Sequence, residues 1–235
     1  MMKTANLVTR HVLCPLALIG GLLISVTAFA GAQQYEPLQA SVRAALQHAV
    51  SDRAPPTLPI DNAVERLKWL LEMSSRLAKR IPDEAYRLEL LIAIHYEATR
   101  AGLDPQMVLG LVQVESAFRK YAVSSSGARG YMQVMPFWIK VIGRGDDNLF
   151  HMRTNLRYGC TILRHYLDIE KGNLYRALGR YNGSLGRPEY PTLVRRAWEN
   201  NWAWTPPPPR TPTAPQLTQP DSDTPNIVVN VGALN

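Results

Sequence analysis

Apolar residues recur every three to four positions through the middle of the chain, which is the spacing of an amphipathic helix. The first such pattern predicts a helix over 37–52, with an apolar side of Leu38, Val42, Leu46 and Val50. The second predicts a helix from Asp61, its expected N-cap, to about Lys79. The expected apolar side of this second helix consists of Val64, Leu67, Leu70 and Leu71.

Capping signals delimit the next two helices. Pro82-Asp83-Glu84 places proline and acidic residues in a first helical turn, which predicts a helix from there to Gly102. Asp104-Pro105 marks the start of another helix, expected to run from Pro105 to Ser116. No alternating apolar and polar run is long enough to indicate a sheet. The predicted fold class is therefore all-α, with minimal β structure at most, up to about Trp204.

The N-terminal residues have the pattern of an export signal. Lys3 and Arg10 precede an apolar run over 12–26, and small residues follow it. The run is shorter than the roughly 20 residues of a membrane-spanning helix, which disfavours an uncleaved anchor. Residues 1–32 are therefore predicted to be a signal peptide that is cleaved near Ala30 or Ala32, which places the protein in the periplasm or outside the cell.

Proline dominates the other end of the chain. Four consecutive prolines, 206–209, open a stretch that is predicted to be a Pro-rich disordered tail over 205–235. A cell-envelope protein that binds this tail is the alternative to a purely solvated tail. Between the two ends, residues 33–82 are expected to form a helical lead-in, and residues 83–204 the main domain.

Charge limits the classes of partner. Lys plus Arg number 26 and Asp plus Glu 19, which gives a net charge of +7 and admits nucleic acid, an anionic membrane surface or an anionic extracellular polymer. Loss of residues 1–32 lowers the charge to +5, since two basic and no acidic residues are removed. The basic clusters lack the aromatic and glycine context of nucleic-acid modules, so no nucleic-acid partner is expected.

Cysteine and histidine usage bears on cofactors and on redox chemistry. The two cysteines exclude a four-cysteine zinc site, and the five histidines form no pair with metal-ligand spacing. No metal or other cofactor is therefore expected. Cys160, the one cysteine that remains after signal removal, is expected to be a small buried apolar residue.

A carboxylate lies within the apolar arc of the predicted helix 105–116. At 100° per residue, Glu115 falls between Leu111 and Val108. Desolvation there raises the pKa of a carboxyl group, and a carboxyl that holds its proton near neutral pH can act as a general acid. The alternative is a boundary glutamate that reaches solvent or pairs with a cation such as Arg119.

Three motifs follow in order after this helix. Glu115-Ser116-Ala117-Phe118, Ser124, Gly127-Ala128 and 130–136 (Gly-Tyr-Met-Gln-Val-Met-Pro) form the first, in which 18 residues separate Glu115 from Gln133. Asn155-Leu156 with Gly159 forms the second, and 180–184 (Arg-Tyr-Asn-Gly-Ser), followed by Tyr190, forms the third. Together they resemble the soluble lytic transglycosylase family, whose catalytic domain is lysozyme-like, over about residues 84–204. Tyr131 and Arg180 depart from the commoner leucine and alanine.

The resemblance implies cleavage of the β-1,4 bond between N-acetylmuramic acid (MurNAc) and N-acetylglucosamine (GlcNAc) in peptidoglycan. It implies that Glu115 is the single general acid and base and that the product is 1,6-anhydroMurNAc. The substrate-binding residues that it implies are Ser124, Met132, Gln133, Tyr181, Asn182 and Tyr190. Ser116 is expected to orient the turn after Glu115, and the enzyme is expected to be a monomer.

Two alternatives remain open. A goose-type hydrolytic lysozyme would use a second carboxylate to activate water, for which Asp146 and Asp147 are candidates, although a solvated turn is preferred there. A non-catalytic peptidoglycan-binding module would lack an active Glu115. Trp198, Trp202 and Trp204 are expected to be core residues rather than sugar-stacking ones.

Overall fold

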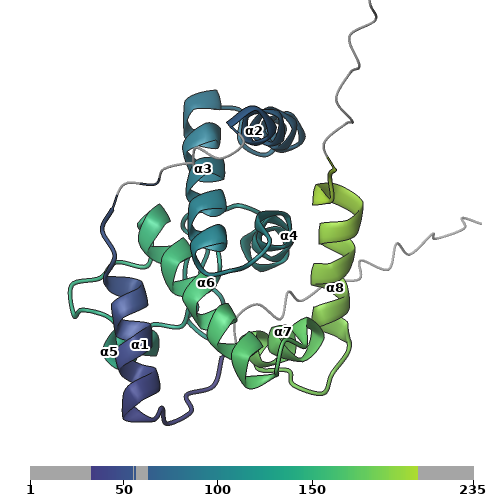
Figure 1. The fold of residues 1–235 in the computed structure, drawn as a ribbon. Helices are drawn as coiled ribbons and strands as arrows, with labels where there is room; N and C mark the ends of the chain where they lie inside the picture. The colour runs from purple at the N-terminus through teal and green to yellow at the C-terminus, as the bar shows by residue number, and fades with distance from the viewer. Residues whose placement is uncertain (1–32, 55, 57–62, 206–235) are drawn as a thin grey trace, which may run out of the picture. The chain divides into compact units, whose positions relative to one another are not determined.

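The computed structural model of the protein describes residues 33–54, 56 and 63–205. These residues form helices, with isolated β-bridges of Arg129 to Val123 and Val134, which confirms the all-α prediction. The helices shown in Figure 1 are α1 (Ala40–Ser51), α2 (Ala63–Leu77), α3 (Glu84–Arg100), α4 (Pro105–Ser116), α5 (Phe137–Ile142), α6 (Met152–Ile169), α7 (Leu174–Asn182) and α8 (Glu189–Ala197). A π-helical turn, η1 (Trp198–Trp202), follows α8.

The predicted caps of α3 and α4 are confirmed. The Asp83 side chain accepts a hydrogen bond from the backbone N–H of Tyr86 at 3.0 Å, and Asp104 accepts one from Gln106 at 2.7 Å. Each carboxylate therefore satisfies a free backbone donor at the positive end of its helix. The bounds of α4 are the predicted ones, Pro105 to Ser116.

The predicted apolar side of α2 is wrong for three of its four residues. Val64, Leu67 and Leu71 are 65%, 55% and 60% exposed. The helix carries a second apolar face, which contains larger side chains and packs on α3. The residues of this face are Trp69, Leu70, Met73 and Leu77. Asp61, the expected N-cap of this helix, lies outside the described residues.

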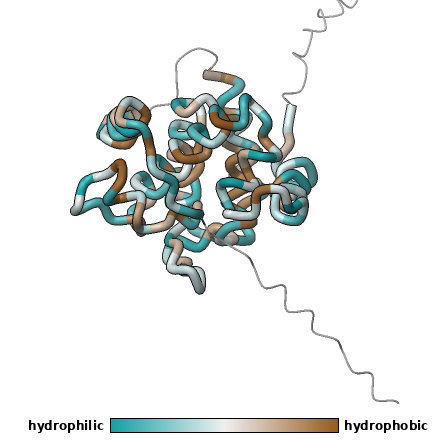
Figure 2. The backbone as a smooth tube through the Cα atoms, turned by 90° about the horizontal axis from the view of Figure 1, so that it is seen from below, coloured by the Kyte–Doolittle hydropathy of each residue, from teal (hydrophilic) through white to brown (hydrophobic). Residues whose placement is uncertain are grey.

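Helices α4 and α6 occupy the centre of the core. Helix α4 packs against α3, α8 and η1, and α6 packs against α1, α3 and α7. Figure 2 shows hydrophobic segments turned toward the interior and hydrophilic ones on the outside. The side of α4 opposite its apolar arc is also covered, because Gln113 accepts a hydrogen bond from the indole N–H of Trp202 at 2.8 Å. Trp202 is completely buried, as expected of a core residue.

The lead-in helices pack on helices of the predicted main domain. Helix α1 contacts α5 and α6, and α2 contacts α3. The described residues up to Trp204 belong to one compact unit. The predicted boundary between 82 and 83 stays a prediction, and side-chain packing crosses it. The predicted signal peptide and, apart from Thr205, the predicted tail lie outside the described residues.

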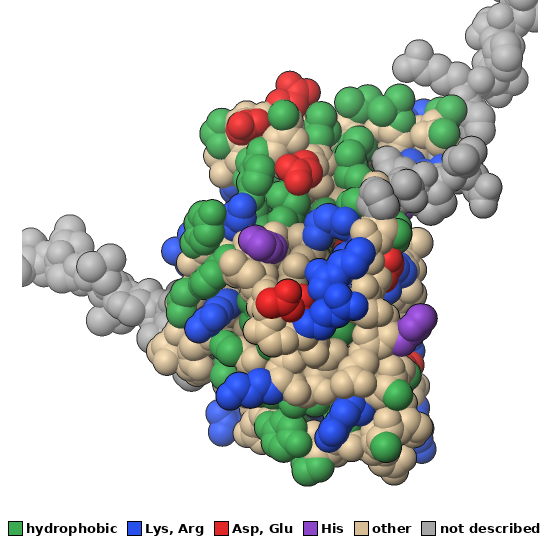
Figure 3. All heavy atoms as spheres, turned by 90° about the vertical axis from the view of Figure 1, so that its left-hand side faces the viewer, with side chains coloured by type: hydrophobic (Ala, Val, Ile, Leu, Met, Phe, Trp, Pro, Cys, Tyr) green, Lys and Arg blue, Asp and Glu red, His purple; other side chains and the backbone are tan. Residues whose placement is uncertain are grey.

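The face of the molecule that carries α1 and α5 is rich in cationic side chains. Figure 3 shows lysine and arginine side chains spread over this face, with a cluster near its middle, and acidic side chains gathered mainly at its top. Within the described ranges, none of the helices combines the length and apolarity that a membrane crossing requires.

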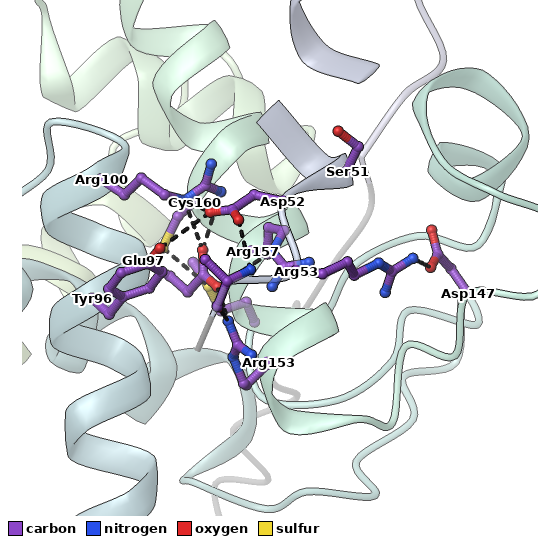
Figure 4. A network of polar contacts seen from close by, with 12 residues as sticks. Ser51, Asp52, Arg53, Tyr96, Glu97, Arg100, Asp147, Arg153, Arg157 and Cys160 are labelled. Atoms are coloured by element: carbon purple, nitrogen blue, oxygen red, sulfur yellow. Dashed lines mark hydrogen bonds and ion pairs between the residues drawn. The ribbon is translucent and has the colours of Figure 1, made fainter. Parts of the chain in front are cut away.

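A buried ionic network joins α1, α3 and α6 (Figure 4). Glu97 of α3 is completely buried and lies 3.1 Å from Arg100 and 3.3 Å from Arg157. Arg100 also lies 3.7 Å from Asp52, at the C-terminal end of α1. Burial raises the pKa of Glu97, and the arginines oppose that shift. The network therefore joins the lead-in to the central helices. Loss of one partner would leave a buried charge uncompensated, which is strongly destabilising.

Candidate active site

Glu115 lies in the last turn of α4 and is only 4% exposed. Its Oε1 accepts a hydrogen bond from the phenol of Tyr190 of α8, and its Oε2 has no partner among the described residues. Arg119, the alternative partner, instead donates to the backbone carbonyl of Ser116 at 3.0 Å. The boundary-glutamate interpretation is therefore wrong, since Glu115 neither reaches solvent nor pairs with Arg119.

Burial dominates the proton affinity of Glu115. Desolvation raises the pKa of this carboxyl to about 8, and the hydrogen bond from Tyr190 opposes that rise. Near neutral pH the side chain therefore carries a proton in most molecules, which is the state that a general acid needs. Its Oε2 is buried without a hydrogen-bond partner, an exception among buried polar atoms that calls for an explanation.

Tyr181 of α7 is bonded to the loop that follows α4. It is completely buried, and its phenol donates to the backbone carbonyl of Met132 at 2.7 Å. Burial raises the pKa of Tyr181 well above its usual range, and the negative charge of Glu115 makes a smaller contribution in the same direction. The Tyr190 phenol is thus the hydrogen-bond donor to the carboxyl, while the Tyr181 phenol is close enough to feel its charge and donates to the loop.

The loop residues implied by the resemblance serve mainly to hold the loop itself. The Gln133 amide donates to the carbonyls of Gly130 at 2.9 Å and Ala122 at 3.1 Å. Ser124 Oγ accepts from the backbone N–H of Ala128 at 3.1 Å. The Met132 side chain is completely buried, with its Sδ 3.9 Å from Cys160 Sγ. A substrate-binding role for these three residues stays a prediction, and the Met132 side chain has no exposed surface to offer.

The second motif anchors this loop to α6. The Asn155 amide accepts from Met132 N and donates to the carbonyls of Arg129 and Leu149, each at 2.8 Å. Gly130 has a φ of +75°, and a Cβ there would lie 2.4 Å from Asn155 Nδ2. Sequence analysis noted Asn155 only as part of a motif, although three hydrogen bonds depend on it.

The same close packing explains Gly159, on the next turn of α6. A Cβ on Gly159 would lie 2.3 Å from Met132 Sδ, so only glycine admits the Met132 side chain. Cys160, beside it, is a free cysteine and is completely buried, as predicted. Burial raises the pKa of its thiol, which keeps it protonated and unreactive.

Asn182 and Ser116 are the last residues of α7 and α4. Asn182 is 4% exposed and donates to Ser184 Oγ at 3.1 Å, and its Oδ1 is buried without a partner. Ser116 Oγ lies 2.8 Å from the Tyr131 carbonyl and 3.2 Å from the Val112 carbonyl. Ser116 therefore ties the turn after Glu115 to the loop, in keeping with its expected role.

The sequence led us to expect a solvated turn at Asp146 and Asp147, but the Asp147 side chain is not solvated. Its side chain is 5% exposed and pairs with Arg53 at 3.0 Å. It also accepts hydrogen bonds from the Tyr158 phenol at 2.5 Å and from the backbone N–H of Arg144 at 3.0 Å. The expectation failed because Arg53, its cationic partner, is distant in sequence. Asp147 is thus occupied with structural partners, while Asp146 is exposed.

One residue at the site escaped sequence analysis altogether. Gln33 precedes α1, is 4% exposed, and accepts a hydrogen bond from the indole N–H of Trp138 at 3.0 Å. No periodicity or motif surrounds it, so the sequence offers no signal for its burial.

Among the described residues, no group of three or more His, Cys, Asp or Glu side chains is arranged to hold a metal ion.

Comparison with known proteins places this site in a family. Residues 92–192 match the model of the Transglycosylase SLT domain. A transglycosylase of Enterobacteria phage PRD1 is 35% identical over 88 residues, which is 37% of this chain and 32% of that protein. Membrane-bound lytic murein transglycosylase C of Glaesserella parasuis is 54% identical, over 43% of this chain and 31% of that protein.

The chain spans about a third or less of the length of these relatives. The matched domain begins within α3 and ends within α8, so it contains Glu115 and every other residue implied by the resemblance. The resemblance to lytic transglycosylases found in the sequence is thereby confirmed over residues 92–192, which are less than half of the chain.

Proposed function

We propose that this protein is a peptidoglycan lytic transglycosylase that cleaves the β-1,4 bond between MurNAc and GlcNAc and forms 1,6-anhydroMurNAc. The observation that carries the proposal is the buried carboxyl of Glu115, whose pKa is raised to about 8 and whose Oε2 has no hydrogen-bond partner. The family match supports the substrate class, and the names of the relatives include lytic murein transglycosylase.

A single carboxyl suffices for this reaction. Protonated Glu115 gives its proton to the glycosidic oxygen as the bond from that oxygen to C1 of MurNAc breaks. The carboxylate of Glu115 then takes the proton of the C6 hydroxyl, and O6 bonds to C1. Glu115 thus regains the proton that it gave. No water takes part, because the nucleophile is a hydroxyl of the substrate.

The surroundings of Glu115 favour this reaction over hydrolysis. Ordinary glycosidases use two carboxylates that flank the scissile bond. The side chain that donates a hydrogen bond to Glu115 is the phenol of Tyr190. Asp147, the second carboxylate considered, is taken up by Arg53, Tyr158 and the backbone of Arg144.

Digestion of purified sacculi followed by mass spectrometry tests the proposal. We expect muropeptides that end in 1,6-anhydroMurNAc, and their loss in Glu115→Gln, which cannot donate the proton. Glu189→Gln, an exposed glutamate of α8, is the matched control and should keep activity. Reducing MurNAc ends would instead identify a hydrolytic lysozyme, and undiminished cleavage by Glu115→Gln would remove Glu115 from the mechanism.

Binding separates the enzyme from a non-catalytic wall-binding module. Glu115→Gln should still sediment with sacculi, since the substitution preserves the shape of the side chain. The cationic face in Figure 3 supports attraction to an anionic wall polymer, and that attraction should weaken as salt increases. A wild-type protein that binds sacculi and releases no muropeptide would be such a module.

We also propose that the protein acts in the cell envelope after its signal peptide is removed near Ala30 or Ala32. The membrane-bound relatives support an envelope location. The sequence read from the N-terminus of the protein in a periplasmic extract should begin at Gly31 or Gln33. A mass that includes residues 1–32 would show that the segment is retained.

We propose further that the protein is a monomer, which size-exclusion chromatography with light scattering tests. A pull-down with residues 205–235 tests whether an envelope protein binds the tail.

A further inference from the structure

The segment before α1 reaches the candidate active site from outside the matched domain. In Figure 1 the purple chain leaves the foot of α1 and runs toward the region where α6 and α7 meet. Gln33, which lies 59 residues before the start of the 92–192 match, is 4% exposed. A glutamine so deeply buried must have partners for its amide, because desolvated polar groups without partners are costly.

The Gln33 side chain finds those partners on the loop and helix that adjoin the site. Its Oε1 accepts hydrogen bonds from Trp138 Nε1 at 3.0 Å and from the backbone N–H of Met135 at 3.3 Å. Its Nε2 lies 3.5 Å from the carbonyl of Gln133, a long contact. The Gln33 amide also acts on the phenol of Tyr181, whose pKa it lowers against the larger effects of burial and of the Glu115 charge.

The neighbours of Gln33 in the sequence fix the segment at two more points. The Tyr35 ring packs edge-on against Phe137 of α5, with 5.9 Å between ring centroids. Glu36 pairs with Arg180 of α7 at 3.1 Å. Arg180 is the position where this chain departs from the commoner alanine of the family that it resembles. That departure supplies the cation that holds the segment, one residue before Tyr181.

We propose that Gln33 is a positioning residue of this active site, which holds the turn at 133–135 and the phenol of Tyr181 in the geometry that Glu115 requires. The proposal rests on the proposed function, since it concerns how the same site is kept in order. Gln33 acts through Tyr181 and the turn and has no part in the chemical step.

The turn that Gln33 holds needs an external support. Gln133 has a φ of +48°, in the left-handed region that side chains other than glycine seldom adopt. The residue before it, Met132, provides the carbonyl that accepts the Tyr181 hydrogen bond. Without Gln33, Trp138 Nε1 and Met135 N lose their acceptor, so the turn can relax and carry Tyr181 away from Glu115.

Substitutions that separate packing from hydrogen bonding test the proposal. Gln33→Met has nearly the same length and cannot accept a hydrogen bond, whereas Gln33→Glu keeps an acceptor for Trp138 and Met135. On a soluble peptidoglycan tetrasaccharide, we expect Gln33→Met to lower kcat roughly 10- to 100-fold. We expect KM to stay within about twofold, as for a residue that orders the transition state. Gln33→Glu should recover most of the lost kcat.

Gln34→Met is the matched control, because Gln34 is the adjacent glutamine and is exposed. It should keep wild-type kcat and KM. A Gln33→Met variant with unchanged or higher kcat would overturn the proposal, and a higher kcat would mean that the segment obstructs the site. A rise in KM alone, or no recovery in Gln33→Glu, would also overturn it.

Two further measurements keep the outcomes distinct. The indole N–H resonance of Trp138 should shift in Gln33→Met and stay in place in Gln34→Met, and circular dichroism should report the same helix content in both. The wild-type product decides the proposed function independently, because an enzyme without anhydro products would refute that function whatever the Gln33 variants do.

Discussion

A single hydrogen bond between Tyr190 and Glu115 tunes the candidate acid. Burial raises the pKa of this carboxyl, and the Tyr190 phenol opposes the rise by stabilising the carboxylate. Since the acid must be protonated to act, kcat/KM should fall as pH rises through about 8, the pKa of Glu115.

Tyr190→Phe removes this hydrogen bond and leaves the ring in place. The pKa of Glu115 should rise further, so the alkaline limb of the kcat/KM profile should move to higher pH. The measurement is a pH series on soluble glycan, with Tyr175→Phe as control, because Tyr175 is an exposed tyrosine that donates to Pro188 O. An alkaline limb that stays in place or moves to lower pH would contradict the assignment.

Glu115 also affects the free energy of unfolding. The folded pKa of Glu115 lies above the ordinary glutamate value of 4.5, so the folded state binds the extra proton between about pH 4.5 and 8. The contribution to stability is therefore complete at low pH and is lost as pH rises. Glu115→Gln, which stays neutral, should raise the free energy of unfolding at pH 8 by roughly 1–4 kcal/mol.

Urea denaturation of wild type and Glu115→Gln at pH 4 and pH 8 measures this effect. The two proteins should have similar free energies of unfolding at pH 4, where Glu115 is protonated in both the folded and, largely, the unfolded state. A variant that is less stable than wild type at pH 8 would mean that the carboxylate is well solvated or paired in the folded protein.

At the scale of elements, local signals predicted helix ends better than helix faces. Asp83 and Asp104 act on backbone groups two or three residues away, so the sequence nearby contains the whole interaction. The buried face of α2 depends on α3, and three of its four predicted apolar residues proved exposed. The apolar arc of α4 indicated partial desolvation of Glu115 and left a boundary position open, whereas the contact of Glu115 with Tyr190 spans 75 residues.

The active-site loop depends on one amide of α6. Asn155→Ala leaves three backbone groups of the loop without partners: Met132 N, Arg129 O and Leu149 O. The expected loss in the free energy of unfolding is about 2–4 kcal/mol, because each unsatisfied buried group is costly. Chemical denaturation measures it, with the exposed Asn200→Ala as control. A loss as small as that of Asn200→Ala would show that the loop is held by other contacts.

At the scale of the whole molecule, the matched domain and the compact unit have different extents. The family match covers 92–192, while α1, α2 and the segment around Gln33 contribute to the same core and site. Sequence analysis treated 33–82 as a lead-in because no motif falls there. The contacts that bind it to the core, such as Arg53 with Asp147 across 94 residues, join positions that no local pattern connects.

The ionic network of Figure 4 makes the joint between lead-in and core sensitive to single substitutions. Arg157→Met removes a cation that is 3% exposed from a glutamate with no exposed surface. We expect a loss of roughly 3–5 kcal/mol, because a buried charge without its partner is strongly destabilising. Arg195→Met breaks an exposed ion pair with Glu199 and should cost about 1 kcal/mol or less. Equal losses would mean that Glu97 gains its stabilisation from Arg100 and Arg153 alone.

Removal of the lead-in tests whether the matched region suffices as a folding unit. A chain reduced to residues 83–205 lacks α1 and α2 and exposes the surfaces of α3 and α6 that these helices cover. It also lacks Asp52, Arg53 and Gln33, so Asp147 loses its cationic partner and the Trp138 indole N–H loses its acceptor. Thermal unfolding of this chain beside residues 33–205 should show a midpoint lower by ten degrees or more, since a loss of 1 kcal/mol shifts a domain of this size by about 2–4 °C. An unchanged midpoint would mean that the lead-in contributes nothing to the stability of the catalytic helices, and that the interfaces with α1 and α2 are dispensable.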